Sequence, residues 1–380
     1  MTERGIKYPE HVPQHRDSAP RLYFLFRSFH FILGIPVFNT PGANANAVKE
    51  LVLASMLLSA RGVYEGHKHM AKMWLEETDN EVVKKRVEKE KKFFRGYELR
   101  GKTLAVVGLG HIGRLVAQSA DKLGMKIVGF DPAISVDTAW QLPRTVKRAE
   151  SMEELLKEAD YLTLHAPYIK DVTHHMISED ELALMKPTCN ILNFARGELV
   201  DSMALKARYE AGTHTGKYIA DFAMPELHDQ GYPVIEVPHL GASTEEAESN
   251  SATMGAKQIT NFLEFGIIKN SVNFPECVPP PQSVGADGNP ITRMSVVNKN
   301  VKGVLAELTT IFGEHKCNIV QHINTSRGDI AYNVIDMAGF PENPKELQIA
   351  LSKVEGILSS RLLVGDPGTY FHVADGQVFA

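Results

Sequence analysis

The chain has 380 residues, of which 43% are hydrophobic and 23% charged, so it can bury a large core and should divide into two or three domains. This composition excludes a chain that is disordered over its whole length. The 41 Lys and Arg residues against 46 Asp and Glu give a formal net charge of -5, which offers no general electrostatic reason to bind nucleic acid or an anionic membrane. A small-molecule partner is the better prediction.

The cysteines and histidines give no pattern of a metal site. Cys189, Cys277 and Cys317 are odd in number and widely spaced, which favours neither a disulfide framework nor a thiolate zinc site. The adjacent His174 and His175 would point apart on an extended segment, so we expect no metal there. No apolar stretch reaches the roughly 20 residues that cross a bilayer, and the acidic N-terminus is not typical of a signal peptide. These features predict a cytoplasmic protein.

The first third of the chain supports secondary-structure predictions in some segments and not in others. Residues 1–33 mix proline, histidine and charge without a clear period and support no secondary-structure prediction. Residues 45–61 carry apolar side chains over a broad helical face after Pro41 and Gly42, which predicts a largely buried helix. Residues 81–92 alternate charges densely around three valines, a pattern that is typical of a helix with a solvated face.

From about residue 102 to residue 238, short apolar runs alternate with amphipathic segments of helical length. This alternation is what a parallel sheet covered by helices on both faces requires, so it predicts a doubly wound α/β domain of the Rossmann type. The predicted strands are 104–107, 126–130, 161–164, 190–194, 218–220 and 234–237, and the predicted helices are 112–123, 151–159, 179–185 and 201–211.

The last third of the chain predicts a second, separate module. Residues 245–265 form a long helix, and residues 275–290, which contain three consecutive prolines, are typical of an extended linker. The pattern after the linker is βαββαβ, which implies an antiparallel sheet with two helices on one face. Its strands are predicted at 294–297, 319–325, 330–337 and 357–363, and its helices at 301–312 and 344–352.

A glycine-rich turn follows the first strand of the parallel sheet. Gly108 permits the tight turn, Gly110 lets the backbone approach a pyrophosphate, and Gly113 allows close packing of helix on strand, while the helix N-terminus supplies unpaired N–H groups. The next strand ends at Asp131, 18 residues beyond the last glycine, where a carboxylate can accept hydrogen bonds from the adenosine ribose. The whole unit therefore predicts a dinucleotide site that prefers NAD, because the carboxylate would repel the 2′-phosphate of NADP.

Two further side chains fit hydride chemistry. Such a reaction needs a group that takes the hydroxyl proton and a cation that binds a carboxylate and polarises a carbonyl. Arg196 and His239 each follow a strand of the parallel sheet, and ligands of such sheets bind outside the carboxyl ends of the strands. Taken singly, the arginine could equally form a surface ion pair, and the histidine could be a hydrogen-bonded loop residue.

Several motifs resemble those of the D-isomer-specific 2-hydroxyacid dehydrogenases. They are GKTL at 101–104, NFARGELVD at 193–201, DFAMPE at 221–226 and PHLGAST at 238–244. The segment FNTPGANANAVKEL at 38–51 and the C-terminal module resemble the branch of that family that oxidises 3-phosphoglycerate to 3-phosphohydroxypyruvate with NAD, in the phosphorylated route to L-serine.

The resemblance implies a role for each matching residue. Arg196 would bind the substrate carboxylate and carbonyl, His239 would be the general acid and base, and Glu226 would be the partner of that histidine. Asp221 would lie near the nicotinamide carboxamide. The remaining positions that would line the cofactor are His111, Ile112, Ala166, Phe194, Ala195, Leu240, Gly241 and Ala242.

The C-terminal module resembles an ACT domain, the effector-binding module of many such enzymes. The resemblance implies that Asn298, Asn300 and Asn318 face an amino-acid effector such as L-serine, held between paired modules of a homo-oligomer. Lys302 stands where family members often have proline, so a purely structural module that forms a dimer is the alternative.

The resemblance also suggests where the domains lie and which alternatives stay open. The protein could instead use another 2-hydroxy acid, such as D-lactate or glycerate. Because residues 1–33 lack the glycine-rich substrate loop of the family, it could also be a weak enzyme or a non-catalytic NAD or serine sensor. The predicted divisions are a remnant of the substrate-binding domain at 1–95, an NAD-binding domain at 96–245, a returning helix at 246–275, a linker at 276–290 and an ACT-like regulatory domain at 291–380.

Overall fold

The structure is a computed structural model that describes residues 34–228, 230–281, 290–363, 371–374 and 377–379. The sequence interpretation of residues 1–33 therefore lies outside the described residues. Contacts divide the chain into two compact units, one of residues 41–251 and one of residues up to 40 together with those from 252 on. We call them the parallel-sheet unit and the antiparallel-sheet unit, and each is described by itself.

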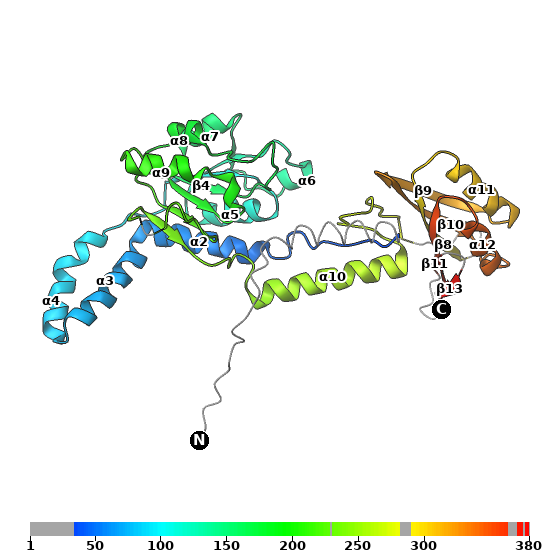
Figure 1. The fold of residues 1–380 in the computed structure, drawn as a ribbon, viewed down its shortest axis with the longest axis horizontal. Coiled ribbons are helices and arrows are strands. Elements are labelled where there is room, and N and C mark those ends of the chain that lie inside the picture. Colours follow the sequence, from blue (N-terminus) through cyan, green and yellow to red (C-terminus); the bar gives the residue numbers. More distant parts are fainter. Residues whose placement is uncertain (1–33, 229, 282–289, 364–370, 375–376, 380) are drawn as a thin grey trace, which may run out of the picture. The chain divides into compact units, whose positions relative to one another are not determined.

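The parallel-sheet unit confirms the predicted doubly wound fold. All its strand pairs are parallel, and the strand order β3-β2-β1-β4-β5-β6-β7 reverses direction between β1 and β4. Figure 1 shows the sheet of this unit with helices packed around it. Such a reversal opens a crevice at the carboxyl ends of the strands. The strands are β1 Thr103–Val107, β2 Lys126–Phe130, β3 Lys147–Arg148, β4 Tyr161–Leu164, β5 Asn190–Asn193, β6 Tyr218–Ala220 and β7 Val234–Glu236.

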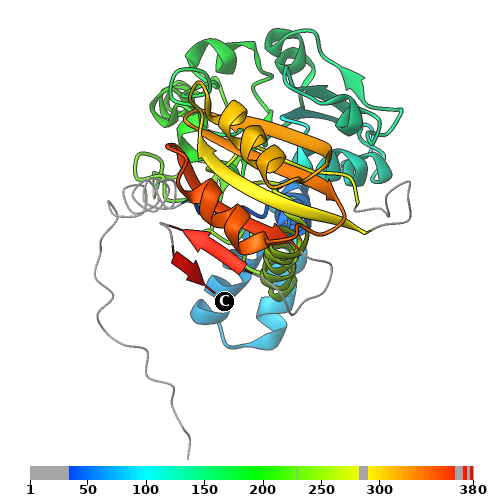
Figure 2. The ribbon, with the colours of Figure 1, turned by 90° about the vertical axis from the view of Figure 1, so that its right-hand side faces the viewer.

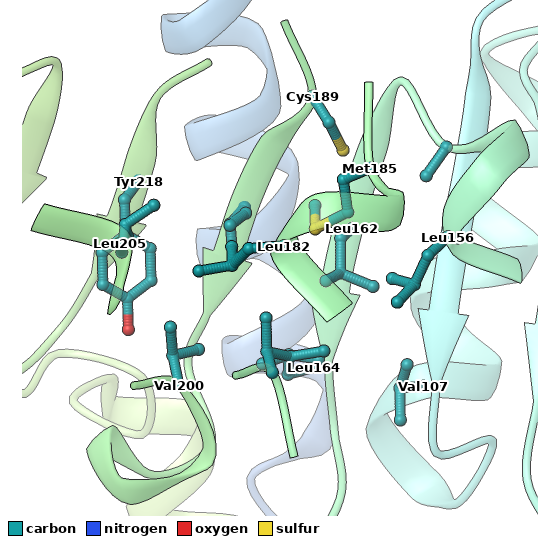
Figure 3. Close-up of a cluster of buried hydrophobic side chains, with 14 of the residues drawn as sticks. Val107, Leu156, Leu162, Leu164, Leu182, Met185, Cys189, Val200, Leu205 and Tyr218 are labelled. Atoms are coloured by element: carbon teal, nitrogen blue, oxygen red, sulfur yellow. The ribbon is translucent and has the colours of Figure 1, made fainter. Parts of the chain in front are cut away.

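Helices cover both faces of this sheet because successive strand residues point to opposite sides. Leu104 and Val106 of β1 pack in one cluster with α2 and α5, whereas Ala105 and Val107 pack in another with α7, α8 and α9. Figure 3 shows side chains of the second cluster, in which Leu162 of β4 packs with Leu182 of α8. The helices are α2 Ala45–Arg61, α5 His111–Lys122, α7 Met152–Glu158, α8 Glu179–Leu184 and α9 Ser202–Glu210, with the short α6 at Val136–Ala139.

A helical hairpin between α2 and β1 was only half predicted. It consists of α3 Val63–Glu76, α4 Asn80–Glu90 and the 3-10 turn η1 Lys91–Phe94. The charged α4 was predicted, and it begins at Asp79, whose side chain accepts hydrogen bonds from two backbone N–H groups. The helix α3 was not predicted, and Met73 is its single buried residue among 14.

The antiparallel-sheet unit contains the predicted βαββαβ module. Its strand order is β13-β12-β11-β8-β10-β9, and the two C-terminal strands β12 and β13 were not predicted. Figure 2 shows α11 and α12 on one face of the sheet. The elements are α10 Glu245–Phe265, which leads into the unit, β8 Ile291–Lys299, α11 Val304–Glu314, β9 Ile319–Arg327, β10 Ile330–Ala338, α12 Pro344–Ser352, β11 Ile357–Leu363, β12 Phe371–Ala374 and β13 Gln377–Phe379.

The other face of this sheet is covered by the chain that follows α10. Ile268, Phe274 and Cys277 are buried there against Tyr332 and Val334 of β10. Residues before Pro281 in the predicted linker are thus partly packed on the sheet. The three cysteines are free thiols, and the described residues contain no cluster of His, Cys, Asp or Glu that could hold a metal ion. In the described ranges, no helix has both the length and the apolarity to cross a membrane.

A buried ion pair links β8 to β10. Arg293 is 1% exposed, and its Nε and Nη2 donate to the two carboxylate oxygens of Asp336 at 2.7 and 2.8 Å. The same guanidinium donates to the carbonyl oxygens of Phe265, at the end of α10, and of Pro280. Every acceptor is supplied by this unit, so the arginine ties the sheet to the chain that covers it.

We predict that Asp336→Ala lowers the free energy of unfolding of the antiparallel-sheet unit by roughly 3–5 kcal/mol, because it leaves the buried guanidinium without its counter-charge. The double variant Arg293→Met, Asp336→Leu should lose less, because it removes both charges and keeps apolar volume. Chemical denaturation followed in the full chain measures both changes. A single variant as stable as the parent chain would contradict the assignment.

Candidate active site

A cavity of about 650 Å³ lies at the carboxyl ends of the central strands of the parallel-sheet unit. Four loops that follow β4, β5, β6 and β7 contribute to it, together with the first turns of α2 and α5. It is lined by Pro41, Asn44, Val48, Ile112, His165, Ala166, Pro167, Tyr168, Phe194, Ala195, Arg196, Asp221, His239, Gly241 and Ala242. The structure thus brings Arg196 and His239, 43 residues apart in sequence, to the walls of one cavity.

The turn after β5 presents Arg196. Asn193 is fully buried, and its Nδ2 donates to the carbonyl of Arg196 at 2.9 Å while its Oδ1 accepts from the N–H of Ala195 at 3.2 Å. These bonds fix the backbone on both sides of the arginine. The guanidinium itself is exposed and donates to the carbonyl of Ala195, and no ion pair holds it within the described ranges. It is therefore available for an anionic ligand.

The loop after β7 presents His239, and Asp221 fixes that loop. Asp221 is 1% exposed at the end of β6, and its Oδ2 accepts from the N–H of Gly241 at 2.9 Å. A Cβ on Gly241 would lie 3.1 Å from that carboxylate oxygen, so only a small residue allows the contact without adjustment. The His239 side chain is exposed at the cavity wall.

Glu226 lies elsewhere. It is exposed and accepts a long hydrogen bond of 3.5 Å from the Ser202 hydroxyl, and it does not line the cavity. No hydrogen bond joins it to His239 among the described residues. Glu236 is engaged by other groups, because it accepts from the N–H of Met224 at 2.6 Å and contacts His228 at 2.5 Å. The pairing of Glu226 with His239 stays a prediction.

The glycine turn is built as the sequence indicates. A Cβ on Gly113 would lie 1.9 Å from the carbonyl oxygen of Gly108, so α5 can approach β1 only with glycine at that position. Gly108 itself has a φ of +83°. Gly110 begins α5 without a side-chain cap, and a Cβ there would meet nothing within 4 Å. The first N–H groups of the helix are thus open to an anion.

Asp131 and His111 lie beside this glycine turn. Asp131 is half-buried at the end of β2, where it accepts from the N–H groups of Leu109 at 2.8 Å and Ala133 at 2.9 Å. A carboxylate can accept further hydrogen bonds, so these two leave room for a ribose. His111 packs its ring on Gly42, where a Cβ would come within 2.7 Å of it.

The structure sorts the predicted site residues into two groups. Those that line the cavity are Ile112, Ala166, Phe194, Ala195, Arg196, Asp221, His239, Gly241 and Ala242, whereas Gly108, Gly110, His111, Gly113, Asp131, Glu226 and Leu240 do not. Sequence reasoning missed Pro41, Asn44, Val48, His165, Pro167 and Tyr168. Of these, His165 directly follows β4 and Tyr168 lies in the same loop, so the position after a parallel strand could have marked them.

Comparisons with known proteins agree with this geometry. Residues 53–243 match the model of the D-isomer specific 2-hydroxyacid dehydrogenase family, NAD binding domain. The chain is 37% identical over 246 residues to a D-3-phosphoglycerate dehydrogenase of Methanocaldococcus jannaschii. The matched segment covers 64% of this chain and 44% of that protein. It is 30% identical over 341 residues to a D-3-phosphoglycerate dehydrogenase of Escherichia coli, covering 87% of this chain and 76% of that protein.

Among solved structures, the apo form of Rhodotorula graminis D-mandelate dehydrogenase resembles this chain with a TM-score of 0.55 and 28% identity, over 65% of this chain and 71% of that one. The chain belongs to the D-isomer specific 2-hydroxyacid dehydrogenases. It is accordingly an NAD-dependent dehydrogenase of 2-hydroxy acids.

The residues present fit NAD, the cofactor of this family. The uncapped N-terminus of α5 offers N–H groups to a pyrophosphate, and the space in front of Gly110 is open to it. Asp131 directly follows β2, where a ribose hydroxyl would need an acceptor. In this dehydrogenase the glycines at 110 and 113 have different tasks, because one faces open space and the other faces backbone.

We predict that substitution of Gly113 lowers stability, whereas substitution of Gly110 weakens NADH binding. Gly113→Ala should lower the free energy of unfolding by roughly 1–3 kcal/mol or more, because its Cβ overlaps the Gly108 carbonyl. Gly110→Ala should keep the parent melting temperature but weaken NADH binding about tenfold or more, because its methyl group faces the pyrophosphate position. Calorimetric titration with NADH and thermal melts measure both. Equal effects of the two variants on melting temperature would refute this division.

Proposed function

We propose that the protein oxidises 3-phosphoglycerate to 3-phosphohydroxypyruvate with NAD, the entry reaction of L-serine synthesis. The relatives named D-3-phosphoglycerate dehydrogenase, at 30–37% identity, support this choice of substrate. The observation that carries the proposal is the presence of Arg196 and His239 on the walls of one cavity. A guanidinium and an imidazole are the two groups that oxidation of a 2-hydroxy acid requires.

The proposed roles follow from the chemistry of each side chain. The exposed guanidinium of Arg196 binds the substrate carboxylate with two parallel hydrogen bonds and polarises the oxygen on C2. An imidazole nitrogen of His239 removes the proton of the C2 hydroxyl. NAD, held at the glycine turn, would supply the acceptor for the hydride on C2. Asp221 holds the loop of His239 in place through Gly241, which keeps the base at a fixed distance from the site of the substrate.

We also propose Glu226 as the partner that orients His239. A carboxylate hydrogen-bonded to an imidazole fixes its tautomer and stabilises its protonated form. The single hydrogen bond of Glu226 in the described part of the chain is a long one from Ser202, so little opposes its turning toward the histidine. Comparison of Glu226→Gln with the parent enzyme across pH is the direct test of this pairing.

We predict that His239→Ala and Arg196→Ala each lower kcat/KM for 3-phosphoglycerate by about 10²-fold or more, because proton transfer and charge stabilisation are typically of this size. Arg196→Lys should restore little, because an ammonium cannot form the bidentate contact. Initial rates of NADH formation measure these effects.

Two surface residues serve as controls for these variants. His67→Ala and Arg148→Ala alter an exposed histidine and an exposed arginine of the same unit and should leave the rate unchanged. In a substrate panel, 3-phosphoglycerate should give the highest kcat/KM. A preference for D-lactate or glycerate would contradict the proposed substrate while leaving the family activity intact.

We further propose that residues 291–380 form a regulatory ACT-like domain, following the predicted domain divisions, and that the protein is a homo-oligomer that binds L-serine through this domain. Asn298 is 2% exposed, and both ends of its amide are engaged, by Asn333 and by the carbonyl of Lys299 at 2.7 Å each. Asn300 is exposed, so it and Asn318 are the better placed of the predicted contacts.

We predict that L-serine lowers the rate of NADH formation and that Asn300→Ala with Asn318→Ala abolishes this inhibition without changing the uninhibited rate. Calorimetric titration of the full chain with L-serine, and its mass by light scattering, provide independent measurements. A parent protein that gives no heat with L-serine would leave the module a structural one.

A further inference from the structure

The antiparallel-sheet unit contains a cavity of its own, of about 210 Å³, which we call the sheet-face cavity. It lies on the face of the sheet opposite to α11 and α12. Its walls come from the chain at 34–36, from the last turn of α10 and from the strands β8, β10 and β11. The volume corresponds to about seven molecules of liquid water at roughly 30 Å³ each, so the cavity has room for a small organic molecule.

The strand register gathers polar side chains in this cavity. Arg361 of β11 lies directly opposite Ser295 of β8. In the next row of the same face, Ser359 of β11 and Tyr332 of β10 lie on either side of Val297. Residues two apart in a strand point to the same face, so three hydroxyl groups and one guanidinium meet at one place on the sheet.

The three hydroxyl groups are not equally engaged. Tyr332 is fully buried and its phenol donates to the carbonyl of Gly266 at 2.9 Å, while the Ser295 hydroxyl lies beside that phenol and is 4% exposed as a residue. In the part of the chain that the structure describes, no hydrogen bond engages the Ser359 hydroxyl. Because a hydroxyl group on a covered sheet face costs free energy unless it finds a partner, Ser359 is suited to a ligand.

Arg361 gives the sheet-face cavity its charge. Its guanidinium lies over the ring of Phe262, with Cζ 4.2 Å from the centroid, and its Nη2 donates to the carbonyl of Phe262 at 2.6 Å. These contacts fix the guanidinium against the end of α10. A guanidinium has five N–H donors and binds carboxylates with two of them. Among the described residues that line the cavity there is no Asp or Glu, so the lining carries a net positive charge.

We propose that the sheet-face cavity binds a small monocarboxylate that has an apolar body and no ammonium group. The carboxylate accepts hydrogen bonds from Arg361 and Ser359, and the apolar body contacts Val297, Phe262 and the chain at 35–36. An ammonium group would lose its hydration without gaining a carboxylate partner, which disfavours amino acids. Neither Asn300 nor Asn318 lines the cavity, so this site is separate from the proposed contacts of L-serine.

Three small molecules of one carbon skeleton test the ligand class. The probe is 4-methylpentanoate. L-leucine adds an ammonium group to it, and 4-methylpentanamide replaces the carboxylate by a neutral amide. The full chain carrying Arg196→Ala is used throughout, because this change removes the proposed carboxylate-binding group of the active site. In ligand-observed NMR titrations the probe should bind, and each of the other two molecules should bind about tenfold more weakly or worse.

Two variants of the cavity test its location. Arg361→Gln should weaken binding of 4-methylpentanoate about tenfold or more and leave binding of the amide unchanged, because only the carboxylate uses the charge. Ser359→Leu should abolish binding of both, because the longer side chain fills the cavity. Thermal melts verify that each variant is folded.

Arg327→Gln is the matched control. Arg327 of β9 also donates to a backbone carbonyl, that of Ser271 at 3.0 Å, but it does not line the cavity. Its replacement should leave the affinity for 4-methylpentanoate unchanged. No binding of the probe to the folded chain, unchanged affinity in Arg361→Gln, or an equal loss in Arg327→Gln would each overturn the proposed site. Equal affinity for L-leucine would overturn the ligand class. None of these measurements uses dehydrogenase activity, so they stand apart from the test of the proposed function.

Discussion

The close approach of α5 to β1 is the constraint on which the site depends. With glycine at positions 108 and 113, backbone meets backbone at a distance that no side chain permits. This contact places the N-terminus of α5 at the carboxyl edge of the sheet, beside the end of β2 and the chain after β4. The partial positive charge of the helix end then lies where an anion can reach it. Asp131, His165 and the cavity are all arranged around this one packing contact.

The catalytic candidates depend on two buried polar residues that fix the backbone around them. Asn193 fixes the turn of Arg196 by bonding the backbone on both sides of it, and Asp221 fixes the loop of His239 through Gly241. Asn193 ends β5 and Asp221 directly follows β6, so the sheet holds the backbone of both exposed side chains in place. An exposed arginine and an exposed histidine can thereby remain available to a substrate and still occupy defined positions.

The C-terminal unit uses its polar interior differently. Its sheet contains a buried ion pair between β8 and β10 and a row of hydrogen-bonded amides across β8, β10 and β9, in which Asn333 donates to Asn298 and accepts from Asn324. Such groups contribute to a single register of the strands, because a shift by one residue would leave each of them unpaired. Register matters in a module whose proposed effector contacts lie at the ends of strands.

Local patterns in the sequence were sufficient to predict much of the fold of this protein. The alternation of apolar runs and helices predicted the parallel sheet, because a sheet buried on both faces must be apolar throughout, and the glycine spacing predicted the turn, because backbone contact admits no other residue. Sequence reasoning missed α3, which buries one side chain, and the sequence could not show the ion pair between Arg293 and Asp336, which joins residues 43 apart. The hydrogen bonds by which Asn193 and Asp221 fix the loops of Arg196 and His239 were equally out of reach. Those features depend on which side chains face one another after folding, and only the tertiary structure decides that.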